Sequence, residues 1–485
     1  MKNITNTKLA VSTSDWLKHL DNLLLFWDKK EAYATGKSDL FPTYHCNTGE
    51  TFDINANPLP DEIVDALNSE DTKGLIELDK NFIRAHSRQT YAYGIAFHMT
   101  SKGKYLNLCK KGVDALLKAI DGNYGMCVTQ TLSGKWDNAR SDRTSQDLAY
   151  GLTGLGMYYF LTHDKTILHR IIQLKDYIFN AYLSDRRGYL MWLPKNNPKS
   201  EGEVQIVAQL DQLYAYMLML TPCLPEPYKS VWKKDMKRIA DILITHFYSE
   251  KYNMFWGTQN NMDRMQLGTD HTDFGHSVKT FWVILKVGQL LGEPFYVHFA
   301  RPNIEKILKD AFIPRVTGSA IPGSWARRFD ANNELDIDKE WWILAELDQA
   351  AEILSIHDPF FYDYLNETQK YWLEVMTDKK DGEIWHMVDG KTNEPVHRFP
   401  KIHNWKTSLH SFEHVLFSYM TAANFANENF HLYYALPEWE TADQDNVAPY
   451  MFFANVVKVE KQKSDIQLEL PDNNEVYKVT FNNLH

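Results

Sequence analysis

The sequence predicts an all-α fold, an (α/α)6 barrel in which six helical hairpins form a ring, followed by a small C-terminal β element. Three observations favour this fold. About twelve stretches carry apolar residues at helical spacing. The connections after odd-numbered helices are long and contain short strand-like runs, whereas those after even-numbered helices are shorter. Near Pro437 the helical period ends, and apolar and polar residues then alternate.

The first helix is expected at residues 14–31, where Ser14 can serve as the N-cap and Trp16, Leu20 and Leu24 share one face. A polar stretch follows to Lys73. The other predicted helices cover residues 75–100, 104–120, 144–162, 166–183, 206–222, 229–248, 273–291, 296–312, 338–356, 359–376 and 408–427. In such a ring the inner helices bury all their faces, and the long connections gather at one end, where they form a binding mouth.

These helices define a predicted barrel domain of residues 1–437, followed by a C-terminal β-rich extension of residues 438–485. Within the extension, alternating side chains predict strands at 456–462, 465–471 and 475–482. Because nothing in these strands suggests chemistry, we expect the extension to pack against the barrel or to mediate self-association, which leaves a homo-oligomer open.

Composition excludes several classes of protein. The 485 residues are 44% hydrophobic and 24% charged, with a net charge of −11 and no block of basic residues, so a nucleic-acid partner is not expected. The four cysteines lie far apart and form no CxxC, which argues against a zinc ribbon or a disulfide framework. No apolar run approaches the ~20 residues that span a bilayer, and the N-terminus lacks a signal-peptide core. We therefore expect a cytoplasmic protein without a membrane partner.

Three predicted helices begin with aromatic residues beside ionisable ones. The stretches are HTDFGHSVKTFWVIL, KEWWILAELDQAAEIL and HNWKTSLHSFEHVLF. Such helix starts place titratable groups where they can face a shared cavity, and an aromatic content of 13% suits a sugar pocket, although it also suits a thick core. The candidate residues on these helix starts are His276, Lys279, Trp342, Glu346, Trp405 and His410.

Each candidate also has a plainer interpretation. An imidazole titrates near ~6.5 and can accept and donate a proton at neutral pH, but a lone His in a helix is more often structural. HSFEH matches the HxxEH zinc motif, with His410 and His414 as ligands, a match that arises easily by chance. Asp147 and Asp211 are candidate acids for glycoside hydrolysis, and each is more often a cap or a polar-network residue. Nucleotide-binding and serine-hydrolase motifs are absent from the sequence.

Five stretches, taken together and in order, resemble the N-acylglucosamine 2-epimerase superfamily, which includes cellobiose 2-epimerases, mannose isomerases and the sulfoquinovose isomerase type. The likeness spans roughly Asp15 to Asn427. SRQTYAYGIAF resembles the Arg-bearing inner helix of that family, LDQLYAY its His-and-Glu helix, and FGHSVKTFW its GHxxExxW stretch. KEWWILAE resembles its [KE]xWWxxAE stretch and NWKTSLH its WKxxxH stretch.

The resemblance implies a chemistry for these residues. Arg88 would polarise the open-chain sugar near O1 and O2, and His276 and His410 would exchange the C2 proton from opposite faces. Removing a proton beside an aldehyde creates an enediolate, so a cation must stabilise its oxygens, and a second base can return the proton with inversion. Returning the proton to C1 instead gives a ketose. This chemistry requires no metal or redox cofactor, and Trp342, Glu346 and Trp405 would shape the sugar site.

The chain departs from the family pattern at two places. Asp211 and Tyr214 stand where the family has an inner-helix His and Glu, and Lys279 replaces the Glu that follows the GH histidine by three residues. The ammonium of Lys279 is expected to lower the pKa of His276, and it could pair with an anionic sugar group.

We therefore expect a cofactor-independent sugar epimerase or aldose–ketose isomerase with a mono- or disaccharide substrate, neutral or anionic. Two alternatives stay open. One is a glycoside or unsaturated-uronide hydrolase on the same barrel, with Asp147 or Asp211 as its acid. The other is a carbohydrate-binding protein that has lost catalysis through the departures at Asp211, Tyr214 and Lys279.

Overall fold

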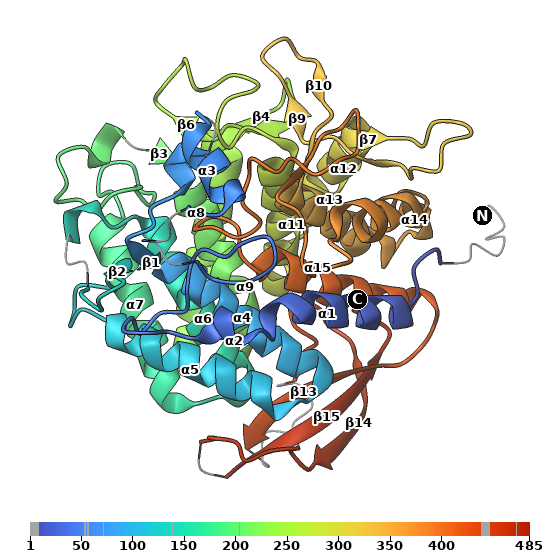
Figure 1. Cartoon of the computed structure of the whole chain (residues 1–485). Coiled ribbons are helices and arrows are strands. Elements are labelled where there is room, and N and C mark those ends of the chain that lie inside the picture. The colour runs from blue at the N-terminus through green and yellow to red at the C-terminus, as the bar shows by residue number, and fades with distance from the viewer. Residues whose placement is uncertain are drawn as a thin grey trace.

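The structure is a computed structural model that describes residues 9–52, 55, 58–70, 72–136, 140–202, 204–437, 447–471 and 473–485. In this part of the chain, helices alternate between an inner and an outer ring (Figure 1). The inner helices are α4 (Ile83–Thr100), α6 (Ser145–Thr162), α8 and α9 (Val207–Gln212 and Leu218–Leu220, joined by a π-helical turn), α11 (Phe274–Leu291), α13 (Trp341–Ser355) and α15 (Leu409–Phe425). The outer helices are α1 (Thr13–Trp27), α5 (Gly103–Ala119), α7 (Lys165–Tyr182), α10 (Tyr228–Ile242), α12 (Pro294–Ala311) and α14 (Tyr362–Tyr371). The predicted (α/α)6 barrel is confirmed.

The inner helices α4 and α6 are buried on almost all sides, while the outer helix α5 keeps one polar face. The sequence of α6 is apolar or small around most of its circumference, whereas α4 also buries polar residues such as Arg88 and Gln89. Small residues allow close packing of α6 on α4. A Cβ at Gly154 would lie 2.9 Å from the backbone oxygen of Ser87, so a larger residue there would push the two helices apart.

The ring closes between the two ends of the chain. α15 packs against α4, and α1 packs against α15. Trp27 on α1 donates through Nε1 to Glu383 Oε2 at 2.6 Å, and Trp372 donates to Nε2 of His19 at 3.0 Å. Segments more than 300 residues apart in the sequence therefore hold the barrel together.

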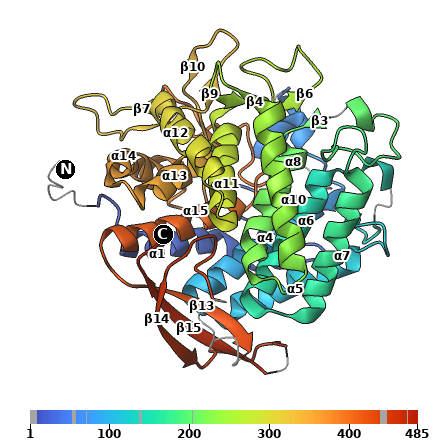
Figure 2. The same ribbon diagram turned by 180° about the vertical axis from the view of Figure 1, so that it is seen from behind.

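Long connections lead from each outer helix to the next inner helix, and short ones lead back, as the sequence predicts. The long connections therefore meet at the N-terminal ends of the inner helices, where antiparallel strand pairs stiffen them (Figures 1 and 2). The strands are β1 (Lys80–Phe82) with β2 (Thr129–Thr131), β3 (Val204–Gln205) with β6 (Thr258–Gln259), β4 (Tyr248–Ser249) with β5 (Met254–Phe255), β7 (Phe312–Ile313) with β8 (Ser324–Trp325), β9 (Arg328–Phe329) with β10 (Leu335–Asp336), and β11 (Lys339–Glu340) with β12 (Met387–Val388).

The first long connection differs from the prediction. The helix expected at 75–100 begins at Ile83, because residues 80–82 pair as β1 with β2. The first helix, expected to end at residue 31, ends at Trp27, and the short helix α2 (Lys30–Tyr33) follows it. The polar stretch after it contains the short helix α3 (Asp61–Asn68). Both helices lie within the connection, so the ring order is unchanged.

The C-terminal sheet covers the opposite end of the barrel. It has the order β13–β15–β14, with β13 at Phe430–Pro437, β14 at Asn455–Gln462 and β15 at Asn474–Asn482. The sheet therefore includes a strand that precedes the predicted boundary at 437/438, and residues 438–446 lie outside the described ranges. As a division into domains, that boundary stays a prediction.

The strand predicted at 465–471 is wrong. This segment forms no ladder and instead packs along α5, where Asp465 Oδ1 accepts a hydrogen bond from the backbone N–H of Gly103 at 2.8 Å. Alternating apolar and polar residues are compatible with a strand, but a strand also needs a neighbouring strand to pair with, and residues 465–471 have none in the described part of the chain.

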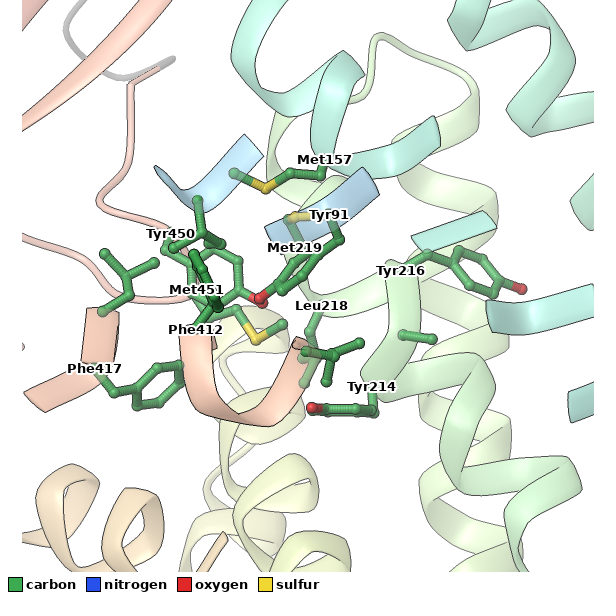
Figure 3. Close-up of a cluster of buried hydrophobic side chains, with 14 of the residues drawn as sticks. Tyr91, Met157, Tyr214, Tyr216, Leu218, Met219, Phe412, Phe417, Tyr450 and Met451 are labelled. Atoms are coloured by element: carbon green, nitrogen blue, oxygen red, sulfur yellow. The ribbon is translucent and has the colours of Figure 1, made fainter. Parts of the chain in front are cut away.

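Beneath the sheet, a buried cluster fills the closed end of the ring. Figure 3 shows Tyr91 of α4, Met157 of α6, Met219 of α9 and Phe417 of α15 around Tyr450 of the C-terminal segment. Tyr450 is only 3% exposed, and its backbone has the left-handed φ of 55°. Across the described ranges, no helix has both the length and the apolar character needed to span a membrane.

Candidate active site

A cavity of about 530 Å³ opens at the end of the barrel where the inner helices begin. Its walls come from α4, α6, α8, α11, α13 and α15 together with the long connections, so residues far apart in the sequence meet there. Seven of the nine predicted site residues line it: Arg88, Asp211, His276, Lys279, Trp342, Trp405 and His410. The other two, Glu346 and Tyr214, lie directly beneath, against Lys279 and His410.

His276 occupies the first turn of α11. The N-cap residue Asp273 accepts hydrogen bonds from the His276 backbone N–H and from its Nδ1, both at 2.7 Å. The imidazole stands edge-on to the Trp342 ring, with 4.5 Å between ring centroids. A helix start, a cap and an aromatic wall thus fix one imidazole at the edge of the cavity.

His410, in the first turn of α15, has a different environment. Its ring lies parallel to the ring of Tyr214, with centroids 6.2 Å apart, and its Nδ1 is 3.5 Å from Glu346 Oε1. Burial lowers the pKa of His410 well below its ordinary value, and the positive charges of Lys279 and Arg88 lower it further. His410 is therefore a neutral imidazole at physiological pH.

Arg88 lies on α4 among aromatic rings. One guanidinium nitrogen donates to the Trp405 backbone oxygen at 2.7 Å, and the guanidinium carbon lies 3.7 Å from the centre of the Tyr150 ring. Among the described residues Arg88 pairs with no carboxylate, whereas Arg84, one turn earlier, is 2.9 Å from Asp147. The charge of Arg88 is thus available to an oxyanion in the cavity.

Lys279 belongs to a buried ionic cluster. Its ammonium lies 3.2 Å from Glu346 Oε1, 4.0 Å from Asp211 Oδ1 and 3.5 Å from the centre of the Tyr214 ring. Burial alone would lower the pKa of Lys279, but the neighbouring carboxylates outweigh it and raise the pKa. The expectation that Lys279 acts on His276 stays a prediction. In the structure the Lys279 ammonium lies against two carboxylates, and its charge lowers the pKa of His410.

Glu346 joins this cluster to His410. Burial raises the pKa of Glu346 to about 7, and the nearby charge of Glu413 adds to the effect while Lys279 opposes it. Trp282 Nε1 donates to its other oxygen at 2.9 Å. Glu346 therefore lies between an ammonium and an imidazole, where a proton can be held near neutral pH.

Glu413 forms the floor of the site, one helical turn below His410. It accepts hydrogen bonds from the hydroxyls of Tyr214 at 2.6 Å, Tyr450 at 2.8 Å and Tyr91 at 3.3 Å, and from Gln349 at 3.3 Å. Figure 3 shows that Tyr91 and Tyr450 approach from different segments. Sequence reasoning missed this role for Glu413, although its position three residues after His410 on one helix was a usable signal.

A metal would find three donors here, but the protein already uses them. Glu346, His410 and Glu413 each place a ligand atom within 4.8 Å of the others. The Lys279 ammonium pairs with Glu346, and three tyrosine hydroxyls donate to Glu413. These partners do not fit a cation bound in the same place.

The zinc interpretation of HSFEH fails on geometry. His414 Nε2 lies 3.0 Å from Asp348 Oδ2, and its ring packs on Trp372 with centroids 4.3 Å apart, so His414 belongs to the core between helices. His410 lines the cavity instead. The two imidazoles therefore do not converge on one ion.

The acids expected for a hydrolase are engaged in the protein. Asp147 pairs with Arg84, and its backbone N–H donates to the N-cap Thr144. Asp211 is buried and accepts from Gln146 Nε2 at 2.6 Å and the Tyr150 hydroxyl at 3.2 Å. Both match the plainer interpretation of polar-network residues.

No protein-family model matches the chain, and no curated protein matches its sequence. Solved structures share its fold. Cellobiose 2-epimerase from Spirochaeta thermophila DSM 6192 has a TM-score of 0.67 and 16% identity, covering 85% of this chain and 97% of that protein. A D-mannose isomerase has a TM-score of 0.63 and 13% identity, covering 84% and 97%. The unsaturated glucuronyl hydrolase from Bacillus sp. GL1 has a TM-score of 0.53 and 10% identity, covering 84% and 96%.

The first two are proteins of the N-acylglucosamine 2-epimerase superfamily. The helical barrel predicted from the sequence is thus a fold that these sugar epimerases and isomerases share. At sequence identities this low, the likeness to these structures concerns the fold alone.

Proposed function

We propose that this protein is a cofactor-independent sugar epimerase or aldose–ketose isomerase that works through proton transfer at C2. The observation that carries the proposal is the meeting of Arg88, which pairs with no carboxylate among the described residues, with the imidazoles of His276 and His410 around one cavity. The similar folds of cellobiose 2-epimerase and D-mannose isomerase support it.

In this proposal the open-chain sugar binds with its carbonyl end beside Arg88. One imidazole removes the proton from C2, the electron pair moves into an enediolate, and the guanidinium stabilises the charge that develops on oxygen. The proton then returns to C2 from the opposite face, which gives the epimer, or to C1, which gives the ketose. His276 and His410, on different helices, are the candidates for these transfers.

The cavity is compatible with a mono- or disaccharide. Its volume of about 530 Å³ falls within the ~300–1,000 Å³ range of small-molecule sites. Trp342 forms one wall, and Trp405, which is 39% exposed, stands at the rim where a sugar face can stack on it. Because Lys279 is already paired, we no longer assign it to an anionic group of the substrate.

The hydrolase alternative has weaker support. It rests on the fold shared with the unsaturated glucuronyl hydrolase, while Asp147 and Asp211 are both held by hydrogen bonds or ion pairs. A hydrolase would cleave a glycosidic bond and leave no label from solvent on C2. A carbohydrate-binding protein would bind a sugar and change nothing.

One experiment separates the three. The protein is incubated in D2O with a panel of neutral and acidic aldoses, ketoses and disaccharides, and products are followed by NMR. Deuterium at C2 of an epimer, or at C1 of a ketose, supports the proposal. His276→Asn and His410→Asn should abolish exchange, and His298→Asn, on the exposed face of α12, serves as the control. Glycosidic cleavage without label, or sugar binding without exchange, contradicts the proposal.

A further inference from the structure

The N-cap of α11 carries an interaction that the family resemblance does not assign. Both carboxylate oxygens of Asp273 contact the same residue: Oδ1 accepts from the His276 backbone N–H and Oδ2 lies 2.7 Å from its Nδ1. An ordinary N-cap needs the first of these contacts and not the second. The second contact couples a buried carboxylate to an imidazole at the edge of the cavity.

This contact selects one form of the imidazole. When a carboxylate accepts from Nδ1, that nitrogen carries the proton and Nε2 keeps its lone pair. In the described part of the chain, Nε2 of His276 has no hydrogen-bond partner, so it is the nitrogen open to a ligand. Once Nε2 accepts a proton, the carboxylate stabilises the imidazolium that forms.

Among the residues that the structure describes, only Asp273 contacts Nδ1 of His276. The family resemblance leads one to expect a Glu three residues after the histidine, but Lys279 stands there and its ammonium points to Glu346 and Asp211. The carboxylate that holds His276 comes instead from the residue three positions before it. In this chain the carboxylate that orients the histidine thus precedes it in the sequence, whereas in the family pattern it follows it.

The second histidine has no equivalent partner. Nδ1 of His410 is 3.5 Å from Glu346, beyond good hydrogen-bond length, and Glu346 is shared with Lys279 and Trp282. The two imidazoles that face the cavity are therefore chemically unequal.

We propose that Asp273 is the positioning residue that makes His276 the principal proton acceptor of the site, a proposal that rests on the proposed function. In the forward step the C2–H bond breaks and the proton passes to Nε2 of His276. The bonding pair moves into the C1–C2 enediolate, whose oxygen charge faces Arg88. The enediolate then takes a proton at C1 from the His276 imidazolium, which becomes neutral again, and the ketose forms. For the epimer, His410 first takes a proton from solvent and gives it to C2 from the opposite side, while the His276 imidazolium releases its proton to solvent.

Other charged groups surround the pair formed by Asp273 and His276, and they contribute to any dependence of this pair on pH. His271 precedes it, with 4.7 Å between the two imidazole centroids, and Asp270 adjoins His271. On α13 and its approach, Glu340 accepts from Trp342 Nε1 at 2.7 Å and lies 3.8 Å from Arg327. Burial would raise the pKa of Asp273, but His276 outweighs burial and lowers it, so Asp273 stays ionised.

The test is Asp273→Asn. Asn is as good an N-cap as Asp, so α11 keeps its start while the charge is lost and the Nδ1 acceptor becomes an amide. We expect kcat to fall by about 10³- to 10⁴-fold, as for other carboxylate–histidine pairs, with KM changing by less than about threefold. Asp164→Asn, at the N-cap of the outer helix α7, is the matched control and should leave kcat unchanged.

A substrate-free measurement separates this proposal from the proposed function. In protein labelled with ¹⁵N-histidine, NMR should show Nδ1 of His276 protonated in the wild type, and Asp273→Asn should shift the tautomer. If His276 has the same tautomer in both proteins, the proposal is overturned. If the tautomer changes but neither protein exchanges label into any sugar, Asp273 still positions His276 and the proposed function fails. Asp273→Ser retains a cap and replaces the Asn variant if that one does not fold.

Discussion

The two ends of the same inner helix hold lysines in opposite circumstances. Lys279 and Lys286 lie seven residues apart on α11, and both are buried. At the open end, Lys279 has the carboxylates of Glu346 and Asp211 as neighbours, and its pKa is raised. At the closed end, Lys286 lies 4.0 Å from the centre of the Phe452 ring, pairs with no carboxylate in the described residues, and burial lowers its pKa to about 7.

The difference teaches that depth along α11 decides which partners its lysines meet. Near the N-terminal end, Lys279 meets carboxylates from other helices beside a cavity. Two turns further, the C-terminal segment places the ring of Phe452 against Lys286 instead. α11 thus runs from an ionic environment to an apolar one within two helical turns.

Lys279→Met should have the largest effect on stability. It leaves Glu346 and Asp211 buried without their cation, and breaking a buried pair in this way costs ~3–5 kcal/mol. Urea unfolding at pH 8 should show this loss in the free energy of unfolding. A variant as stable as the wild type would mean that the carboxylates are not held charged by Lys279.

Arg88→Met should affect turnover rather than folding. Removing one oxyanion-stabilising donor costs ~10²–10³-fold in kcat, equivalent to ~3–4 kcal/mol. Because Arg88 is not paired with a carboxylate in the described ranges, its loss leaves no buried anion behind, and the melting temperature should change little. Steady-state kinetics on the substrate found by label exchange, with a thermal melt of each protein, checks this. Equal loss of stability and activity would argue for a structural role.

Lys286→Met should change how stability depends on pH. The pKa of Lys286 is depressed in the folded protein, so between about pH 7 and ~10.5 the unfolded chain binds more protons, and the wild type gains up to ~1.4 kcal/mol per pH unit as pH rises. The variant loses this slope and should be more stable than the wild type at pH 7. Unfolding at pH 7, 8 and 9 measures this slope in both proteins, and equal slopes would contradict the prediction.

Tyr450→Phe should have the smallest effect. It removes a hydroxyl that donates to Glu413 at 2.8 Å, and hydrogen bonds to charged groups are worth ~1.5–3 kcal/mol, of which Tyr214, Tyr91 and Gln349 retain a part. We expect a loss near ~1.5 kcal/mol. Tyr434→Phe, whose hydroxyl donates to the Ala448 backbone oxygen at 2.8 Å, is the control. If Tyr434→Phe lowers the free energy of unfolding by more than Tyr450→Phe does, the Tyr450–Glu413 hydrogen bond is not the stronger of the two.

Most of the fold could be predicted because its main signals are local. Helical spacing gives twelve helices, and alternating connection lengths give the pairing, so the ring follows without knowledge of any distant contact. The errors occur where partners decide the outcome. Residues 80–82 became a strand because β2 lies beside them, and 465–471 did not become one because α5 lies there instead.

The sequence indicated which residues line the candidate site, but it indicated less well which of them contact one another. Motifs located Arg88, His276 and His410, which line one cavity as expected. They did not indicate that Lys279 would turn toward Glu346, since that depends on how two helices face each other. Tyr450 carried no signal at all, because its approach to Glu413 depends on the path of a distant segment.

The closure of the ring also shapes how the chain must be made. Trp27 meets Glu383 and Trp372 meets His19, so contacts of very high sequence separation complete the barrel. While a ribosome still holds the last inner helix, α1 lacks α15, the helix it packs against. Contacts between segments so far apart in the sequence slow folding and prolong aggregation-prone intermediates, so chaperone assistance during synthesis should matter more for this architecture than its all-helical content suggests.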